Sequence, residues 1–303
     1  MTGDFRKNGV VDWPTFALML ACYGAWGLAI TVLAGLWLPA AIVLTTLTVT
    51  LHSSLQHEVL HGHPFRIRLL NEALVFLPVG LFIPYGRFRD THLAHHQDEI
   101  LTDPYDDPES NFLDPVRWAR LSAPVRWVLR FNNTLLGRMV LGPGLGSVSF
   151  AWGDLRAIAA GDRAILRDWL LHLVGLCLIA PLIAASAMPF WAYVAAAYMG
   201  LSILKIRTFL EHRANDLARG RTVIIESGLI LPFLFLNNNL HAVHHCRPAV
   251  AWYRLPALYR QGRDDYLNRN QGYLYRSYAE VFRQHLLRVK DPVPHPLWPG
   301  AKP

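Results

Sequence analysis

Charged residues are scarce in this chain of 303 residues: they make up 17% of it, whereas hydrophobic residues make up 52%. The mean hydropathy is positive, at +0.22. A soluble protein carries about 25% charged residues, so the composition indicates an integral membrane protein rather than two soluble domains. The formal net charge of +7 is then expected to lie on a cytoplasmic face.

Cysteine is also rare, since the chain has only three cysteines and no C-x-x-C pair. This excludes a disulfide framework. Basic stretches interleaved with aromatic residues, as a nucleic-acid groove requires, are lacking as well, and no nucleic-acid partner is expected. The first apolar run is too long for a cleavable signal peptide and lacks a small-residue cleavage signature, which indicates a first membrane helix.

Long apolar runs are prominent, and a membrane span needs about 20 such residues. Residues 14–36 and 39–51 predict one helical hairpin, and residues 169–187 and 190–209 predict a second. Arg6 and Lys7 precede the first run, which places the N-terminus on the cytoplasmic side. The expected fold is an all-α membrane protein with four transmembrane helices, arranged as hairpins at about residues 14–58 and 168–211.

The remaining chain is more polar. Shorter apolar segments at residues 69–85, 139–152 and 223–236 contain proline or glycine and predict interfacial helices. Residues 62–167 and 212–290 carry many arginines and are expected to form a cytoplasmic cap, whereas the Pro-rich residues 291–303 are expected to be a loose tail. The whole chain is expected to be a single membrane-embedded domain.

Three clusters of histidine carry the chemistry. They are His57 with His61, His92 with His95 and His96, and His241 with His244 and His245. Residues three and four apart lie on one face of a helix, so each cluster aims two or three imidazoles at one point. Neutral imidazole is a ligand for iron, zinc, copper and nickel. Eight nitrogens are too many for one tetrahedral zinc, which leaves two metals, or one metal with several spectator histidines.

Other polar residues are candidates near this site. His212 follows the second predicted hairpin, on the same side of the membrane as the clusters, and is a candidate ninth ligand. The acidic run from Asp98 to Glu109 is either a solvated loop or a source of carboxylates for the second ring nitrogen of a ligand histidine. The candidates for that second role are Glu58, Asp103, Asp106, Asp107 and Asn238. Whether His52 or His63 also binds metal stays open.

The clusters HEVLH, HLAHH and HAVHH resemble, in pattern and order, the histidine boxes of the integral-membrane fatty acid desaturase and hydroxylase superfamily. The resemblance covers roughly residues 14–254. It implies a pair of irons held by all nine histidines named above, with His212 at the place of the ligand that follows the fourth helix. It also implies O2 as co-substrate and an electron donor of the ferredoxin, rubredoxin or cytochrome b5 type.

The resemblance further implies oxidation of an unactivated C–H bond of a lipid, and the first two boxes favour fatty-acyl desaturation. A hydroxylase or ketolase acting on an alkyl chain or a carotenoid would use the same site and stays open. A multi-pass protein of a bacterial inner membrane is expected, with the metal site on the cytoplasmic side.

Two rival functions remain. His57-Glu58-x-x-His61 is also the motif of zinc metalloproteases, although an intramembrane protease has no use for the other two clusters. A metal transporter would hold its site near the middle of the bilayer, whereas these histidines are expected at the cytoplasmic rim.

Overall fold

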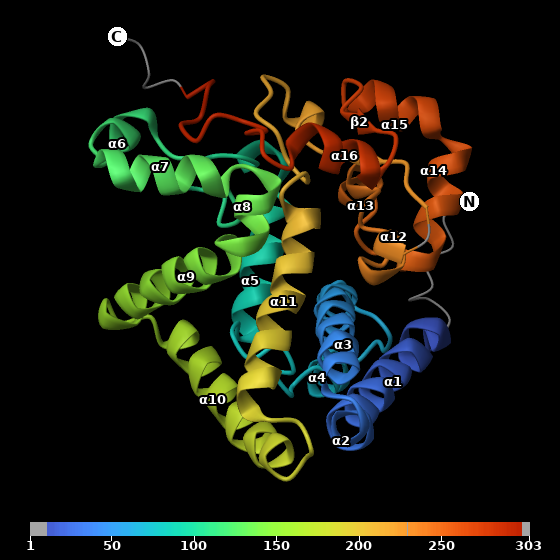
Figure 1. Ribbon diagram of the computed structural model, residues 1–303. Coiled ribbons are helices and arrows are strands. Elements are labelled where there is room, and N and C mark those ends of the chain that lie inside the picture. Colours follow the sequence, from blue (N-terminus) through green and yellow to red (C-terminus); the bar gives the residue numbers. More distant parts are fainter. Residues whose placement is uncertain (1–10, 229, 299–303) are drawn as a thin grey trace. The chain divides into compact units, whose positions relative to one another are not determined.

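The computed structural model describes residues 11–228 and 230–298 (Figure 1). The chain divides into two compact units. The first unit takes in the chain up to Arg89 and Ser147–Leu201, and the second takes in Asp90–Gly146 and the chain from Ser202 onward. Helices α5, α9 and α11 contribute residues to both units. The expectation of a single domain stays a prediction.

The first unit is built mainly from long apolar helices. They are α1 (Trp13–Leu28), a π-helical turn (Ala29–Leu33), α2 (Ala34–Leu36), α3 (Leu38–Leu60), α4 (Arg68–Leu74), the start of α5 (Tyr85–His95), the end of α9 (Gly142–Ala159), α10 (Arg163–Ala184) and most of α11 (Phe190–Thr208). Helix α10 begins where Oδ1 of Asp162 accepts hydrogen bonds from the backbone N–H groups of Ala164 and Ile165. Such a cap satisfies amides that have no partner within the helix.

Within the described residues, three helices are long and apolar enough to cross a membrane, namely Trp13–Leu36, Leu38–Leu60 and Arg163–Ala184. Helix α11 is not among them, and it carries Lys205 and Arg207 in its last turn. The prediction of a mainly helical membrane protein is therefore confirmed. The fourth span and the cytoplasmic cap stay predictions.

One side of α10 is apolar and exposed. Leu170, Leu173, Val174, Leu178 and Leu182 are each between 50% and 53% exposed. An exposed apolar surface of this extent on a soluble protein would favour aggregation. On a helix of this length it is suited to lipid chains, which agrees with a membrane span.

The core of the first unit joins α1, α3, α10 and α11. Nε1 of Trp26 donates to the Tyr193 hydroxyl at 2.9 Å, and this hydroxyl donates to the backbone carbonyl of Val79 at 2.9 Å. Helices α3 and α11 approach closely at Gly200, where an added Cβ would lie 2.6 Å from Cγ1 of Val49. The small residue therefore allows the two helices to pack.

The second unit combines short helices with a two-stranded parallel sheet. Its helices are α6 (Pro115–Ala119), α7 (Ala123–Asn132), α8 (Leu135–Val140), α12 (Ile230–Leu234), α13 (His241–Cys246), α14 (Leu255–Gln261), α15 (Arg263–Arg269) and α16 (Tyr278–His285), with 3-10 turns at Asp98–Ile100, Ala218–Gly220 and Trp252–Arg254. Strand β1 (Ile224–Ile225) pairs with β2 (Leu274–Tyr275). Ile224 also packs in a core with Leu240, Val243 and Leu255.

Two predicted segments differ in detail from the structure. Of the described residues in 223–236, Ile230–Leu234 alone are helical, since the β-branched Ile224 and Ile225 pair with β2 instead. In the predicted tail, the backbone of Leu113 donates to the carbonyl of Val293 at 2.9 Å and accepts from the N–H of His295 at 2.8 Å. Residues 299–303 of that segment lie outside the described residues.

The buried chain of hydrogen bonds through Tyr193 generates a stability prediction. Tyr193→Phe leaves the Trp26 N–H and the Val79 carbonyl without this partner, and we expect the free energy of unfolding to fall by roughly 1–3 kcal/mol. Thermal unfolding in detergent measures the change. Tyr105→Phe is the control, because its hydroxyl bonds Asp114 at the surface. Equal stability of the two variants would contradict the prediction.

Candidate metal centre

Four histidines of the second unit converge, and we name them the first histidine group: His95 on α5, His212 after α11, and His241 and His245 on α13. One nitrogen of each lies within 4.8 Å of the others. Nε2 of His212 is 2.8 Å from Nε2 of His95 and 3.1 Å from Nε2 of His241. Nε2 of His245 is 3.2 Å from Nε2 of His241.

A second histidine group in the same unit consists of His92, His96 and His244. Nε2 of His96 lies 2.9 Å from Nε2 of His92 and 3.1 Å from Nε2 of His244. The arrangement of the two groups explains why the H-x-x-H-H pattern occurs twice in the sequence. Each box gives its pair spaced four residues apart to one group and its remaining histidine to the other, so that α5 and α13 each serve both groups.

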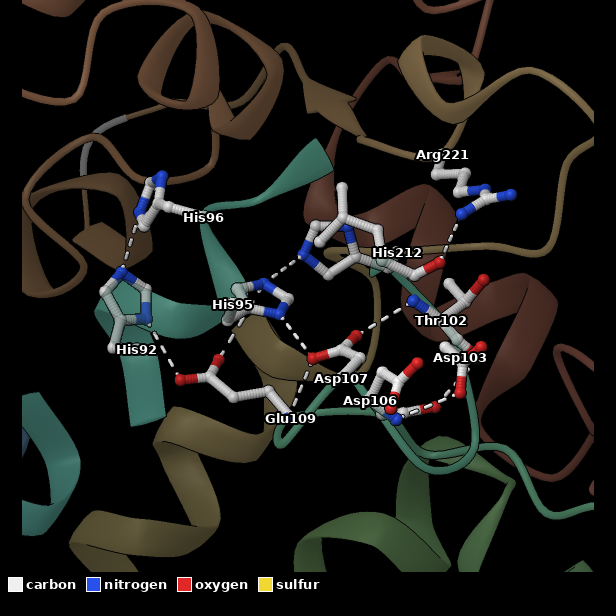
Figure 2. A network of polar contacts seen from close by, with 12 residues as sticks. His92, His95, His96, Thr102, Asp103, Asp106, Asp107, Glu109, His212 and Arg221 are labelled. Atoms are coloured by element: carbon white, nitrogen blue, oxygen red, sulfur yellow. Dashed lines mark hydrogen bonds and ion pairs between the residues drawn. The ribbon is translucent and has the colours of Figure 1, made fainter. Parts of the chain in front are cut away.

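Carboxylates fix the orientation of the α5 imidazoles, as Figure 2 shows. Nδ1 of His95 donates to Oδ1 of Asp107 at 2.7 Å, and Nδ1 of His92 donates to Oε1 of Glu109 at 3.0 Å. Asp107 is buried and also accepts a hydrogen bond from the backbone N–H of Thr102. With Nδ1 as the donor, a neutral imidazole presents the lone pair of Nε2 to the centre of its group.

An amide performs the same task on α13. Nδ1 of His241 lies 2.9 Å from Oδ1 of Asn238, which only accepts, so Nδ1 carries the hydrogen. Oε1 of Glu211 lies 3.7 Å from the same Nδ1 and 2.8 Å from Nε of Arg207. Glu211 therefore brings a buried negative charge to the imidazole of His241 and is itself balanced by Arg207.

These hydrogen bonds leave more acceptors than donors at the centre of the first histidine group, and a cation there would satisfy the excess acceptors. When His95 and His241 are neutral, the lone pairs of both rings face Nε2 of His212, which has at most one hydrogen to donate. Metal–nitrogen bonds of about 2.1 Å place two nitrogens about 3.0 Å apart at a right angle and about 3.4 Å apart at a tetrahedral angle. The observed spacings of 2.8–3.2 Å fit a metal ion with ligands near right angles. The residues therefore fit a metal.

Burial and nearby charges shift the pKa values of the histidines in opposite directions. Burial lowers the pKa of His212 and of His241 well below the usual value, so both imidazoles are neutral. Burial also lowers the pKa of His95, but the charges of Glu109 and Asp107 outweigh it and raise the value to about 9. The same carboxylates favour a positive charge at Nε2 of His95, which a proton supplies when no metal is bound and a metal cation would supply in its place.

The model of the fatty acid desaturase family matches residues 34–277. The chain belongs to the fatty acid desaturase family. The match spans all three histidine boxes and most of the helices described above, and it confirms the resemblance seen in the sequence. Family membership implies an oxidoreductase, and lipid oxidation at a histidine-rich metal site fits the two groups. No match was found among curated proteins.

The first box of this desaturase-family protein lies in the first unit, at the end of α3. The rings of His57 and His61 are adjacent there, with their centroids 4.8 Å apart. Glu58 is buried, and its Oε1 lies 3.9 Å from Nδ1 of His57, beyond hydrogen-bond distance.

Two histidines left open by the sequence have other partners. Tyr23 donates its hydroxyl hydrogen to the carbonyl of Leu74 at 2.6 Å, so His52, at 3.0 Å, donates to that hydroxyl through Nε2. Nδ1 of His63 lies 2.8 Å from the carboxylate of Asp12. Neither histidine belongs to either histidine group.

Two of the expected acidic partners, Asp103 and Asp106, have other surroundings among the described residues. Asp103 accepts hydrogen bonds from the backbone N–H groups of Tyr105 and Asp106 and so closes a turn, while Asp106 is exposed. Glu109 and Glu211, in contrast, were not predicted as partners. Glu109 lies in the acidic run but was not singled out, and Glu211 directly precedes His212, which is the one sequence signal that pointed to it.

A backbone scaffold connects the segments that carry histidines. The N–H of Val223 donates to the carbonyl of Glu211 at 3.1 Å, and the carbonyl of Val223 accepts from Ala242 at 3.0 Å. Nη1 of Arg221 donates to the carbonyl of Leu101 at 2.6 Å and holds the turn that leads to Asp107. Segment 221–225 therefore links His212, α13 and the acidic turn.

Loss of one ligand tests the first histidine group. His241→Ala removes a nitrogen that lies against two others, and we expect bound metal to fall to about half of the wild-type content or less. Metal per chain is measured by plasma mass spectrometry. His285→Ala is the control, because His285 bonds Tyr275 and lies in neither group. The prediction is wrong if both variants keep the wild-type metal content.

Two substitutions in the acidic turn test the role of the carboxylate that contacts His95. Asp107→Asn removes the carboxylate charge beside His95, and we expect metal affinity to fall by about 10–100-fold. Asp106→Asn, one residue away and exposed, is expected to leave affinity unchanged. Competition with a chelator measures both affinities. A similar loss in both variants would show that the net charge of the turn, and not the contact with His95, sets the affinity.

Proposed function

We propose that this protein is a membrane-bound di-iron oxidoreductase that uses O2 to oxidise an unactivated C–H bond of a lipid, and that its reaction is fatty-acyl desaturation. The supporting observation is the convergence of Nε2 lone pairs in two adjacent histidine groups, in a chain of the fatty acid desaturase family. Hydroxylation or ketolation at the same centre is the second candidate reaction.

The proposed ligand set rests on the geometry and on the family pattern. The first histidine group would hold one iron, and His92, His96 and His244 would hold another. We further propose, from the histidine-box pattern of the sequence alone, that His57 and His61 complete the ligand set. Imidazole is a suitable ligand for iron, and the spacings near right angles favour a metal with more ligands than tetrahedral zinc takes.

The residues around the imidazoles orient the rings so that their Nε2 atoms can bind a metal. Asp107, Glu109 and Asn238 hold the Nδ1 hydrogens of His95, His92 and His241, so that each Nε2 remains a ligand. Neutral imidazoles do not reduce the charge of two metal ions, and the nearby carboxylates of Asp107, Glu109 and Glu211 offset part of it. Bound iron would supply the activation of O2 that an unactivated C–H bond requires.

The proposed desaturation balances with an external donor. Two hydrogen atoms leave adjacent carbons of the acyl chain, O2 is reduced to two molecules of water, and a carrier supplies two electrons while the solution supplies two protons. A protein of the ferredoxin, rubredoxin or cytochrome b5 type is the proposed carrier. We place the centre on the cytoplasmic side of a bacterial inner membrane, as the positive-inside rule favours.

Lipid profiling tests the activity. Cells that express the wild-type chain are expected to accumulate new unsaturated acyl chains in the presence of O2, and the products are measured by mass spectrometry of extracted lipids. His95→Ala is expected to abolish them because it removes a nitrogen of the first histidine group. His285→Ala is expected to retain them.

Isotopically labelled O2 separates the candidate reactions. Desaturation leaves the lipid product without label, whereas hydroxylation or ketolation places a labelled oxygen atom in it. Products that persist without O2, or in the His95→Ala variant, would overturn the proposal. A single zinc per chain together with peptide cleavage would support the protease alternative instead.

A further inference from the structure

A pocket of about 300 Å³ lies within the first unit, at the low end of the size range of ligand sites. The ends of two apolar helices line it: Gln56 lies one turn before the end of α3, and Arg167 and Asp168 lie in the second turn of α10. Helix α4 and the start of α5 complete the wall. Because both apolar helices end here, we expect the pocket to lie at the level of the membrane headgroups.

The walls combine apolar and basic side chains. Val75, Phe76, Ile83 and Leu171 form apolar surface. Three arginines, Arg68, Arg89 and Arg167, also line the pocket, against two carboxylates, Glu72 and Asp168. The side chains of Arg68 and Arg167 are 71% and 60% exposed, so their ion pairs contribute little and both guanidinium groups can turn to an anion. The net charge favours a ligand that carries an anionic group.

A buried carboxylate adds a second requirement. Asp168 is 5% exposed, and its Oδ1 accepts hydrogen bonds from Nε and Nη2 of Arg167. Its Oδ2 is buried without a hydrogen-bond partner among the described residues. A buried acceptor left in this way is costly, so a ligand that donates a hydrogen bond to Oδ2 would bind more tightly than one that does not.

Neighbouring residues fix the position of this acceptor. Gly86 lies against the carboxylate of Asp168, where an added Cβ would be 2.6 Å from Oδ2. His172 donates from Nε2 to the carbonyl of Leu81 at 2.8 Å, which leaves Nδ1 of a neutral ring as a further acceptor on a residue of the wall. The pocket thus offers cations for an anion and acceptors for a donor.

We propose that this pocket binds the headgroup of a phospholipid whose phosphate faces the arginines and whose hydroxyl or ammonium group donates to Oδ2 of Asp168. Phosphoglycerol and phosphoethanolamine headgroups share this chemistry. A phosphocholine headgroup has the phosphate but no donor. The site is separate from the two histidine groups in the second unit, and the proposal does not depend on the oxidation of a lipid.

Native mass spectrometry of the purified full chain tests the proposal. Phosphatidylglycerol, phosphatidylethanolamine and phosphatidylcholine are added separately to the protein in detergent, and the lipid that stays bound is counted. We expect both donor-bearing lipids to bind roughly tenfold more tightly than phosphatidylcholine. Equal retention of all three lipids would overturn the proposal, and full competition by free glycerol phosphate at equal concentration would overturn the assignment to a lipid.

Two variants locate the preference. Asp168→Asn replaces the acceptor without changing its size and is expected to remove the preference for donor-bearing lipids without weakening phosphatidylcholine binding, since the loss of a carboxylate charge leaves the pocket more positive. Asp162→Asn is the matched control, because it removes the same charge from α10 outside the pocket and asparagine still caps a helix. The proposal would be overturned if Asp168→Asn kept the preference for donor-bearing lipids over phosphatidylcholine. It would also be overturned if Asp162→Asn lost this preference to the same extent.

A third variant keeps the test decisive if Asp168→Asn does not fold. Gly86→Ala places a methyl group against the same carboxylate and is expected to reduce the preference without changing any charge. Unchanged preference in this variant would contradict the proposed position of the headgroup. All of these outcomes are independent of metal content and of product formation.

Discussion

The second unit depends on a single electrostatic constraint, which is that imidazole lone pairs face one another at about hydrogen-bond distance. Asp107, Glu109 and Asn238 take the Nδ1 hydrogens and so prevent His95, His92 and His241 from turning the other nitrogen inward. Lone pairs in this arrangement repel unless a proton or a metal cation lies between them. A bound metal would remove this repulsion, and the free energy of its binding would then contribute to the free energy of folding.

The same constraint explains why short helices suffice in this part of the molecule. Helix α13 has six residues, and three of them are histidines that point to two different groups. A helix of this length is unstable alone, but Val243 packs in a core with Ile224 and Leu255, and the backbone of Val223 bonds to Ala242. Within fewer than two turns of helix, α13 therefore directs its histidines to the two groups and packs Val243 in the core.

The sequence predicted the parts of this structure that follow a local period. Spacings of three and four residues identified His92, His95 and His96 as neighbours, and apolar runs located α1, α3 and α10. Helix α3 extends nine residues beyond its predicted run, and α10 begins six residues before its own. The contacts of the acidic turn were not predictable in the same way, because its backbone has no repeat. Asp107 faces His95 while Asp103 closes the turn, and nothing in their spacing distinguishes the two roles. Similarly, Ile224 and Ile225 pair with residues about fifty positions later, beyond the reach of any local pattern.

Segment 221–225 would have to accompany the histidines if such a centre were transferred to another protein. Arg221 holds the acidic turn through the carbonyl of Leu101, and Val223 joins the segment of Glu211 to α13. A designed scaffold that copied only the histidine boxes would lack the connection that fixes the spacing of His212 from His241. The smallest portable form of the centre therefore includes this segment, which contains no histidine and would not be recognised in a search for metal ligands.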